Sequence, residues 1–142
     1  MQRKASANWK GGLRDGEGTL TTASGVLATT PFSFGTRFED ADGTNPEELI
    51  GAAHAGCFSM ALSMILGEAG YTPELIDTRA AVTLEEVDDG FAITAVHLDV
   101  KAKVPGAGES DFREAAEKAK QGCPVSKALD VEITMETRLV ET

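Results

Sequence analysis

The sequence predicts an α+β fold, with antiparallel β-sheets wrapped around a long buried central helix. Three observations lead to this prediction. Residues 45–69 read as one helix with apolar residues on every side, which favours an enclosed position over a surface one. Segments before and after it alternate apolar and polar residues with the period of a β-strand. At 142 residues, the chain has the length of a single domain that can bury its own core.

The bulk composition narrows the classes of function. A composition of 42% hydrophobic and 25% charged residues is that of an ordinary globular protein. The net charge of -10, with scattered basic residues, argues against a nucleic-acid partner. No run of about 18 apolar residues is present, so no membrane span is expected, and the N-terminus lacks the apolar segment of a secretory signal. The only cysteines, at positions 57 and 123, fit neither a disulfide framework nor a zinc ribbon.

The first 44 residues are expected to form a β-hairpin region. Residues 5–10 and 17–22 have strand character and flank a glycine-rich turn. The segment that follows is rich in Gly, Ser, Thr and Pro, with one short β-like piece at 31–38. This connecting segment brings Arg37 shortly before the central helix.

The central helix, about residues 45–69, has clear start and stop signals. Asn45 can cap the helix with its side chain, and Pro46 suits the first helical position. Glu48 lies three residues after the cap, as in a capping box, and Gly70 is placed to end the helix.

The C-terminal portion, 78–142, is expected to have the order ββαβ. Strands are predicted at 78–87 and 91–104 around an Asp-Asp-Gly turn. A helix starting at Asp111 and ending at Gly122 follows, and a last alternating strand covers 131–139. With the preceding regions this makes one domain over 1–142, organised around the helix.

The two cysteines are the candidates for chemistry. A thiol reacts as its thiolate, which needs a nearby cation or helix N-terminus, and Arg37 is the best local cation for Cys57. Pro124 is expected to open a short helix that Cys123 caps, so that the sulfur faces free backbone N–H groups. Glu47 is better suited to holding an arginine than to activating sulfur, because a carboxylate raises the pKa of a neighbouring thiol.

The same residues also allow inert or metal-binding roles. Spacing alone favours inert core cysteines over redox chemistry, and both over a metal site. A metal site would use Cys57, Cys123, His54 and His97. A hydrogen-bonded core histidine is the favoured interpretation of His54, and a surface ion pair that of Arg37 taken alone. Ser126 and Lys127 are expected to make no more than cap and solvent contacts.

Two motifs resemble a known family. Residues 45–59, Asn-Pro-Glu-Glu-Leu-Ile-Gly-Ala-Ala-His-Ala-Gly-Cys-Phe-Ser, and 122–127, Gly-Cys-Pro-Val-Ser-Lys, are similar to the osmotically inducible protein C and organic hydroperoxide resistance proteins (OsmC/Ohr). The first motif and Thr36-Arg37-Phe38 look like the OsmC branch. The resemblance covers essentially the whole chain. It implies an OsmC-like fold, an intertwined homodimer and a cysteine-based peroxidase of the bacterial cytoplasm that reduces organic hydroperoxides in oxidative and osmotic stress defence.

The resemblance also implies roles for four residues. Cys57 looks like the peroxidatic thiol and Cys123 the resolving thiol, with Arg37 and Glu47 as the activating pair. Cys57 would become a sulfenic acid, and Cys123 would condense with it to a disulfide. The enzyme would need no cofactor or metal, but an external dithiol must reduce it, of lipoyl type by analogy with Ohr-like relatives.

Helix geometry adds an expectation about Glu47. On a straight helix, Glu47 and Cys57 are about 15 Å apart along the axis. Either the helix bends at Gly51 or Gly56, or the central helices of two protomers pack antiparallel and Glu47 serves the partner's site. The second arrangement is favoured, and it makes the dimer obligatory for activity.

An apolar substrate pocket is expected near the dimer interface. The residues expected to form it are Phe58, Met60, Phe32 and Phe34. A binding protein for small molecules or acyl chains, with structural cysteines, is the alternative from a different class, and a metal-binding module is the third.

Overall fold

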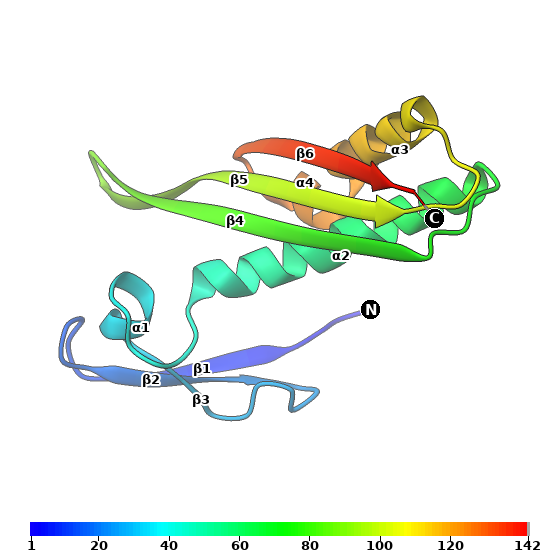
Figure 1. Cartoon of the computed structure of the whole chain (residues 1–142). Coiled ribbons are helices and arrows are strands. Elements are labelled where there is room, and N and C mark those ends of the chain that lie inside the picture. The colour runs from blue at the N-terminus through cyan, green and yellow to red at the C-terminus, as the bar shows by residue number, and fades with distance from the viewer. Residues whose placement is uncertain (142) are drawn as a thin grey trace. The chain divides into compact units, whose positions relative to one another are not determined.

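The computed structural model describes residues 1–141, which form two compact units, residues 1–49 and residues 50 onward. Each unit is described by itself (Figure 1). In chain order the elements are β1 (Ala5–Lys10), β2 (Glu17–Thr22), β3 (Thr30–Phe32), α1 (Phe34–Phe38), α2 (Pro46–Glu68), β4 (Leu75–Val87), β5 (Gly90–Lys103), α3 (Glu109–Gly122), α4 (Pro124–Ala128) and β6 (Glu132–Val140). The mixture of helices and sheets confirms the predicted α+β class.

The first unit is built on a small antiparallel sheet with the strand order β1-β2-β3. Strands β1 and β2 have the bounds that the sequence predicts. The β-like piece expected at 31–38 is wrong in its second half, where α1 is helical. Ser33 explains the change, because it forms a capping box with Thr36: its hydroxyl accepts from the Thr36 N–H, and the Thr36 hydroxyl accepts from the Ser33 N–H.

The Asn45 cap and the Gly70 stop of α2 follow the sequence prediction, but the predicted capping box is wrong, because the Glu48 side chain bonds Thr44 and not the Asn45 N–H. The side chain of Asn45 accepts a hydrogen bond from the Glu48 N–H at 2.8 Å. The Glu48 carboxylate accepts a hydrogen bond from the Thr44 hydroxyl at 2.8 Å. This bond ties the first turn of the helix to the residue before the Asn45 cap. At the other end, Gly70 has a φ of +91°, which glycine adopts without strain, and the chain leaves the helix there.

Within this chain, α2 is buried on one face only, so the predicted enclosure on every side is wrong for a single chain. Residues three and four apart point inward. The buried positions are Glu47, Gly51, His54, Phe58, Leu62 and Leu66, and the exposed ones include Ala52, Ala53, Gly56, Met60, Ser63 and Met64. The buried side chains of α2 pack in the core of the β4-β5-β6 sheet, and the opposite side of the helix exposes Met60 and Met64.

Helix α2 is also long and apolar enough to cross a membrane, judged by length and composition only. This differs from the expectation that no segment meets that criterion. A core helix of a soluble protein passes the same test. Here α2 places Phe58, Leu62 and Leu66 in the hydrophobic core of its own chain, and we therefore treat it as a packing helix.

The second unit consists of the sheet β4-β5-β6 with α2 and α3 on one face (Figure 1). β4 and β5 pair antiparallel, but β5 and β6 pair parallel, so the prediction of purely antiparallel sheet is wrong here. The physical reason is that α3 and α4 carry the chain back to the starting end of β5. The core of this unit contains Phe58, Leu62 and Leu66 from α2, Val96, Leu98, Val100 and Ala102 from β5, and Phe112, Ala116 and Ala119 from α3.

The connection from α3 to α4 positions the second cysteine. Helix α3 begins at Glu109, two residues before the expected start, and ends at Gly122 as expected. Helix α4 begins at Pro124 with Cys123 as its N-cap, as the sequence predicts.

Candidate active site

The two cysteines meet at the start of α4. Cys57 projects from the middle of α2, and its thiol lies close enough to the Cys123 thiol and to the backbone N–H of Val125 for both groups to shift its pKa. Both cysteines are free thiols; Cys57 is half-buried, whereas Cys123 is 1% exposed. The arrangement brings together two sulfur atoms that are 66 positions apart in the sequence.

The surroundings of Cys57 make it a weak acid. Burial raises the pKa of the Cys57 thiol, and the hydrogen bond and charge of Cys123 raise it further. The Val125 N–H, which favours the thiolate, acts in the opposite direction. Among the described residues of its unit, the groups that shift the pKa of Cys57 include no lysine, arginine or histidine. The thiol pair therefore has contact geometry for redox chemistry but lacks a charge that would stabilise the Cys57 thiolate.

A line of hydrogen bonds continues from Cys123 into the core. The Cys123 sulfur lies 3.0 Å from the Ser126 hydroxyl and accepts from the Ser126 N–H at 3.4 Å. The same hydroxyl lies 2.7 Å from Nε2 of His54 on α2. The expectation that Ser126 makes only cap and solvent contacts is wrong, since it is buried and joins α2 to Cys123. No local signal in the sequence distinguishes Ser126 from an ordinary first-turn serine, because its partner His54 lies 72 positions earlier.

His54 is a buried, hydrogen-bonded histidine, as its favoured interpretation predicts. Its side chain is fully buried, and burial lowers the pKa of its imidazole, which keeps it neutral at physiological pH. Its Nδ1 atom has no hydrogen-bond partner among the described residues. His97 instead bonds Thr134 on β6 at 2.6 Å. No group of three metal ligands is formed in residues 1–141, so the metal alternative gains no support.

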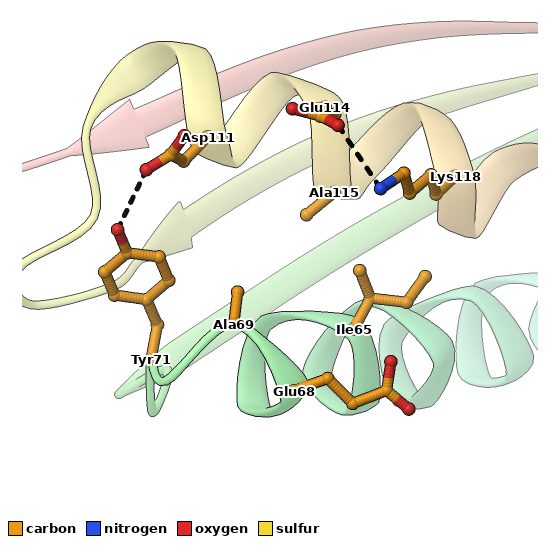
Figure 2. A pocket seen from close by; sticks show the side chains of 8 residues that line it. All are labelled: Ile65, Glu68, Ala69, Tyr71, Asp111, Glu114, Ala115 and Lys118. Carbon is orange, nitrogen blue, oxygen red and sulfur yellow. Dashed lines mark hydrogen bonds and ion pairs between the residues drawn. The ribbon is translucent and has the colours of Figure 1, made fainter.

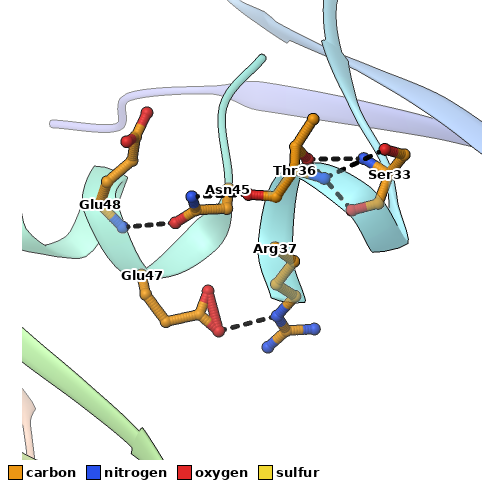
Figure 3. Close-up of polar contacts among 6 residues, drawn as sticks. All are labelled: Ser33, Thr36, Arg37, Asn45, Glu47 and Glu48. Carbon is orange, nitrogen blue, oxygen red and sulfur yellow. Dashed lines mark hydrogen bonds and ion pairs between the residues drawn. The ribbon is translucent and has the colours of Figure 1, made fainter. Parts of the chain in front are cut away.

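Arg37 and Glu47 form an ion pair in the first unit (Figure 3). Nε of Arg37 donates to Oε1 of Glu47 at 2.7 Å, and the Glu47 side chain is 10% exposed. The second carboxylate oxygen, Oε2, is buried without a partner in the described part of the chain. α1 carries the arginine, and the first turn of α2 carries the glutamate, with Asn45 bonding the Thr36 carbonyl between them. This charge-assisted bond fixes the guanidinium and leaves its outer N–H groups for another acceptor.

An aromatic cavity lies beside the same arginine. It has a volume of about 170 Å³ and is lined by Trp9, Leu13, Phe32, Ser33, Phe34, Arg37, Phe38 and Pro46. Phe32 and Phe34 therefore line a cavity, as expected. Phe58 does not, because it is fully buried in the core of the second unit, and Met60 is 77% exposed on the open face of α2.

A second pocket lies between the end of α2 and α3, away from the thiols (Figure 2). Its volume is about 400 Å³, and Tyr71 donates across its rim to Asp111 at 2.9 Å. Lys118 pairs with Glu114 at 3.2 Å, so both polar pairs of the rim are satisfied internally. None of its lining residues is a thiol or a free cation, and it offers no redox chemistry.

Comparison with known proteins identifies the family. The family model described as OsmC-like protein matches residues 39–138. Peroxiredoxin OsmC of Escherichia coli is 55% identical over 139 residues, which are 98% of this chain and 97% of that protein. The chain belongs to the OsmC family. Among solved structures, the organic hydroperoxide resistance protein OhrB of Bacillus subtilis matches with a TM-score of 0.70 and 25% identity over 95% of this chain and 98% of that one. An OsmC-like protein from Vibrio cholerae matches at 0.77 and 17% identity over 97% and 99%, and shows the same fold.

In this OsmC-family chain the four predicted site residues fall into two pairs, one in each unit. Cys57 contacts Cys123, and Arg37 contacts Glu47. The helix that carries Glu47 and Cys57 is uninterrupted at Gly51 and Gly56.

Proposed function

We propose that the chain is a thiol-dependent peroxidase that reduces organic hydroperoxides to alcohols in oxidative and osmotic stress defence. The single observation that supports this most is the contact between the Cys57 and Cys123 thiols at the start of α4. Relatives named peroxiredoxin and organic hydroperoxide resistance protein agree with an oxidoreductase that detoxifies peroxides.

The reaction proceeds in two covalent steps. The Cys57 thiolate attacks the distal oxygen of the hydroperoxide, the O–O bond breaks, and the alkoxide takes a proton and leaves as the alcohol. Cys57 is then a sulfenic acid. The Cys123 thiolate attacks the Cys57 sulfur, the S–O bond breaks, and the hydroxide that leaves takes the proton released by Cys123, giving a disulfide and water. An external dithiol, of lipoyl type, exchanges with this disulfide and restores both thiols.

Arg37 supplies the missing positive charge in this proposal. Glu47 orients the guanidinium of Arg37 through the 2.7 Å bond, which leaves the outer N–H groups available to a Cys57 thiolate of a second chain and to the peroxide. Glu47 and Cys57 are ten residues apart on an uninterrupted helix, about 15 Å along its axis, so the two cannot share one site within a chain. This favours an antiparallel dimer in which Arg37 and Glu47 serve the thiols of the partner chain. The open apolar face of α2 suits such a two-fold interface.

The aromatic cavity beside Arg37 gives the substrate preference. Rings of Trp9, Phe32 and Phe34 offer apolar contact to an alkyl or aryl group, while the guanidinium faces the peroxide oxygens. Organic hydroperoxides are therefore the preferred substrates over hydrogen peroxide. The site needs no cofactor, and we place the enzyme in the bacterial cytoplasm, where a dithiol can reduce it.

One equivalent of cumene hydroperoxide tests the proposal. We expect the reduced protein to lose two hydrogen atoms by mass spectrometry, with a Cys57–Cys123 peptide in the digest. The Cys123→Ser variant should stop at a Cys57 sulfenic acid that a dimedone probe traps, and Cys57→Ser should not react. Two free thiols after this treatment would refute the peroxidase.

A further inference from the structure

The donors and acceptors can be assigned in the buried hydrogen bonds that link His54, Ser126 and Cys123. Nδ1 of His54 is buried without a partner in the described residues, and a buried N–H without an acceptor is rarer than an unsatisfied acceptor. The proton of the neutral imidazole therefore belongs on Nε2, which lies 2.7 Å from the Ser126 hydroxyl. Nε2–H donates to Ser126 Oγ, and this leaves the hydroxyl hydrogen to point at the Cys123 sulfur 3.0 Å away.

We propose that His54 is a positioning residue for the resolving thiol: through Ser126 it holds a hydroxyl donor on the Cys123 sulfur, where the donor stabilises the negative charge of this sulfur when it attacks or leaves. This inference rests on the proposed function, in which Cys123 attacks Cys57. Together with the Ser126 backbone N–H at 3.4 Å, two donors converge on this sulfur. The titratable side chains next to Cys123 in the described contacts are Cys57 and, through Ser126, His54.

The hydrogen bond from the Ser126 hydroxyl to the Cys123 sulfur acts in both the oxidation and the reduction of the thiol pair. When Cys123 attacks the Cys57 sulfenic acid, the donors stabilise the attacking thiolate before the S–S bond forms. When the external dithiol attacks the Cys57 sulfur, the S–S bond breaks and Cys123 leaves as a thiolate that the same hydroxyl stabilises. A thiolate that is easier to form also leaves faster.

The test uses an aromatic disulfide with a coloured thiolate, so no peroxide is involved. Cys57, the more exposed thiol, attacks the reagent and releases one coloured thiolate; Cys123 then attacks the mixed disulfide on Cys57 and releases the second. The second release measures the nucleophilicity of Cys123 directly. It should be first-order and independent of reagent concentration in the parent protein.

The decisive variants are His54→Leu and Ser126→Ala. Each variant weakens or removes one hydrogen bond to the attacking sulfur, and one hydrogen bond to a charged group corresponds to about a ten- to hundredfold change in an equilibrium constant. Part of the lost rate is recovered, because a thiolate with fewer hydrogen bonds is a better nucleophile. We therefore expect the second release to slow about three- to tenfold at neutral pH. The double variant should be no slower than either single one, and His54→Gln, which keeps a donor near the Nε2 position, should recover most of the rate.

The controls separate this inference from the proposed function. Compared within the Cys123→Ser background, His54→Leu and Ser126→Ala should change the first release by less than about twofold, because Cys57 performs that step and the hydrogen bonds from His54 and Ser126 lead to position 123. An unchanged second release in both His54→Leu and Ser126→Ala, or equal slowing in His54→Leu and His54→Gln, would overturn the inference while peroxide still oxidises the parent. A parent that shows no second release would overturn both. Slowing in the variants, in a parent that peroxide does not oxidise, would support the positioning role and refute the peroxidase.

Discussion

Met60 provides the sharpest test of the proposed dimer. Its side chain is 77% exposed in the single chain, on the open face of α2. Complete burial of a methionine side chain contributes about 1.5–3 kcal/mol, so burial of the exposed part in an interface contributes about 1.5 kcal/mol per protomer. Two-fold symmetry doubles this to about 3 kcal/mol per dimer. We therefore expect Met60→Ala to raise the dimer dissociation constant about a hundredfold.

Sedimentation velocity over a protein concentration series measures this constant. Val26→Ala is the matched control, because Val26 is 84% exposed but lies in the loop between β2 and β3. Equal dissociation constants for Met60→Ala and the parent, or a parent that is monomeric throughout the series, would refute the α2 interface. An equal effect of Val26→Ala would show that exposed apolar residues in general hold the dimer.

Three further predictions concern the caps and the charges. Asn45→Ala should lower the free energy of unfolding by about 1 kcal/mol in urea titrations, because the Glu48 N–H loses its acceptor; an unchanged value would show that Thr44 and Glu48 cap the helix without it. Because burial lowers the pKa of His54, its neutral form stabilises the fold above the ordinary histidine pKa of about 6.5, and this stability is lost as the pH falls through the lowered value. The stability of the parent should therefore fall with acid over that range, and a His54→Leu curve with the same slope would contradict this origin. Glu47→Gln should slow Cys57 oxidation by cumene hydroperoxide about tenfold, since Arg37 loses its charged partner, while Glu39→Gln should not; equal rates in stopped-flow measurements would exclude the ion pair from activation.

Local signals predicted the elements, and the errors came from long-range packing. Capping residues at Asn45 and Cys123 and the period-two pattern of β4 and β5 set their elements almost independently of context. The direction of β6 relative to β5 did not follow from its own alternation, because alternation is the same in parallel and antiparallel strands.

In the candidate site, too, local signals were predictable and long-range contacts were not. The motif residues Cys57 and Cys123 could be named from the sequence, and the capping position of Cys123 could be predicted, but their proximity depends on the packing of α2 against the start of α4. Ser126 was missed as a buried link, because a serine three residues after a cap reads as an ordinary first-turn residue until α2 brings His54 against it. The exposure of one α2 face was also hidden, since an all-apolar helix can be covered either by its own chain or by a second one.

The exposed face of α2 and the weak acidity of Cys57 both point to a second chain, which would cover the helix and supply a cation to the thiol. Burial and Cys123 raise the pKa of the Cys57 thiol, and among the described residues of its own unit only the Val125 N–H lowers it. If the cation is the partner's guanidinium, as proposed, a dissociated chain keeps its thiol pair but loses reactivity toward peroxide. Met60→Ala should then have a low rate of Cys57 oxidation at low protein concentration that recovers to the parent rate as concentration rises through its dissociation constant. A rate per thiol that is independent of concentration while the dimer dissociates would show that each chain activates its own Cys57.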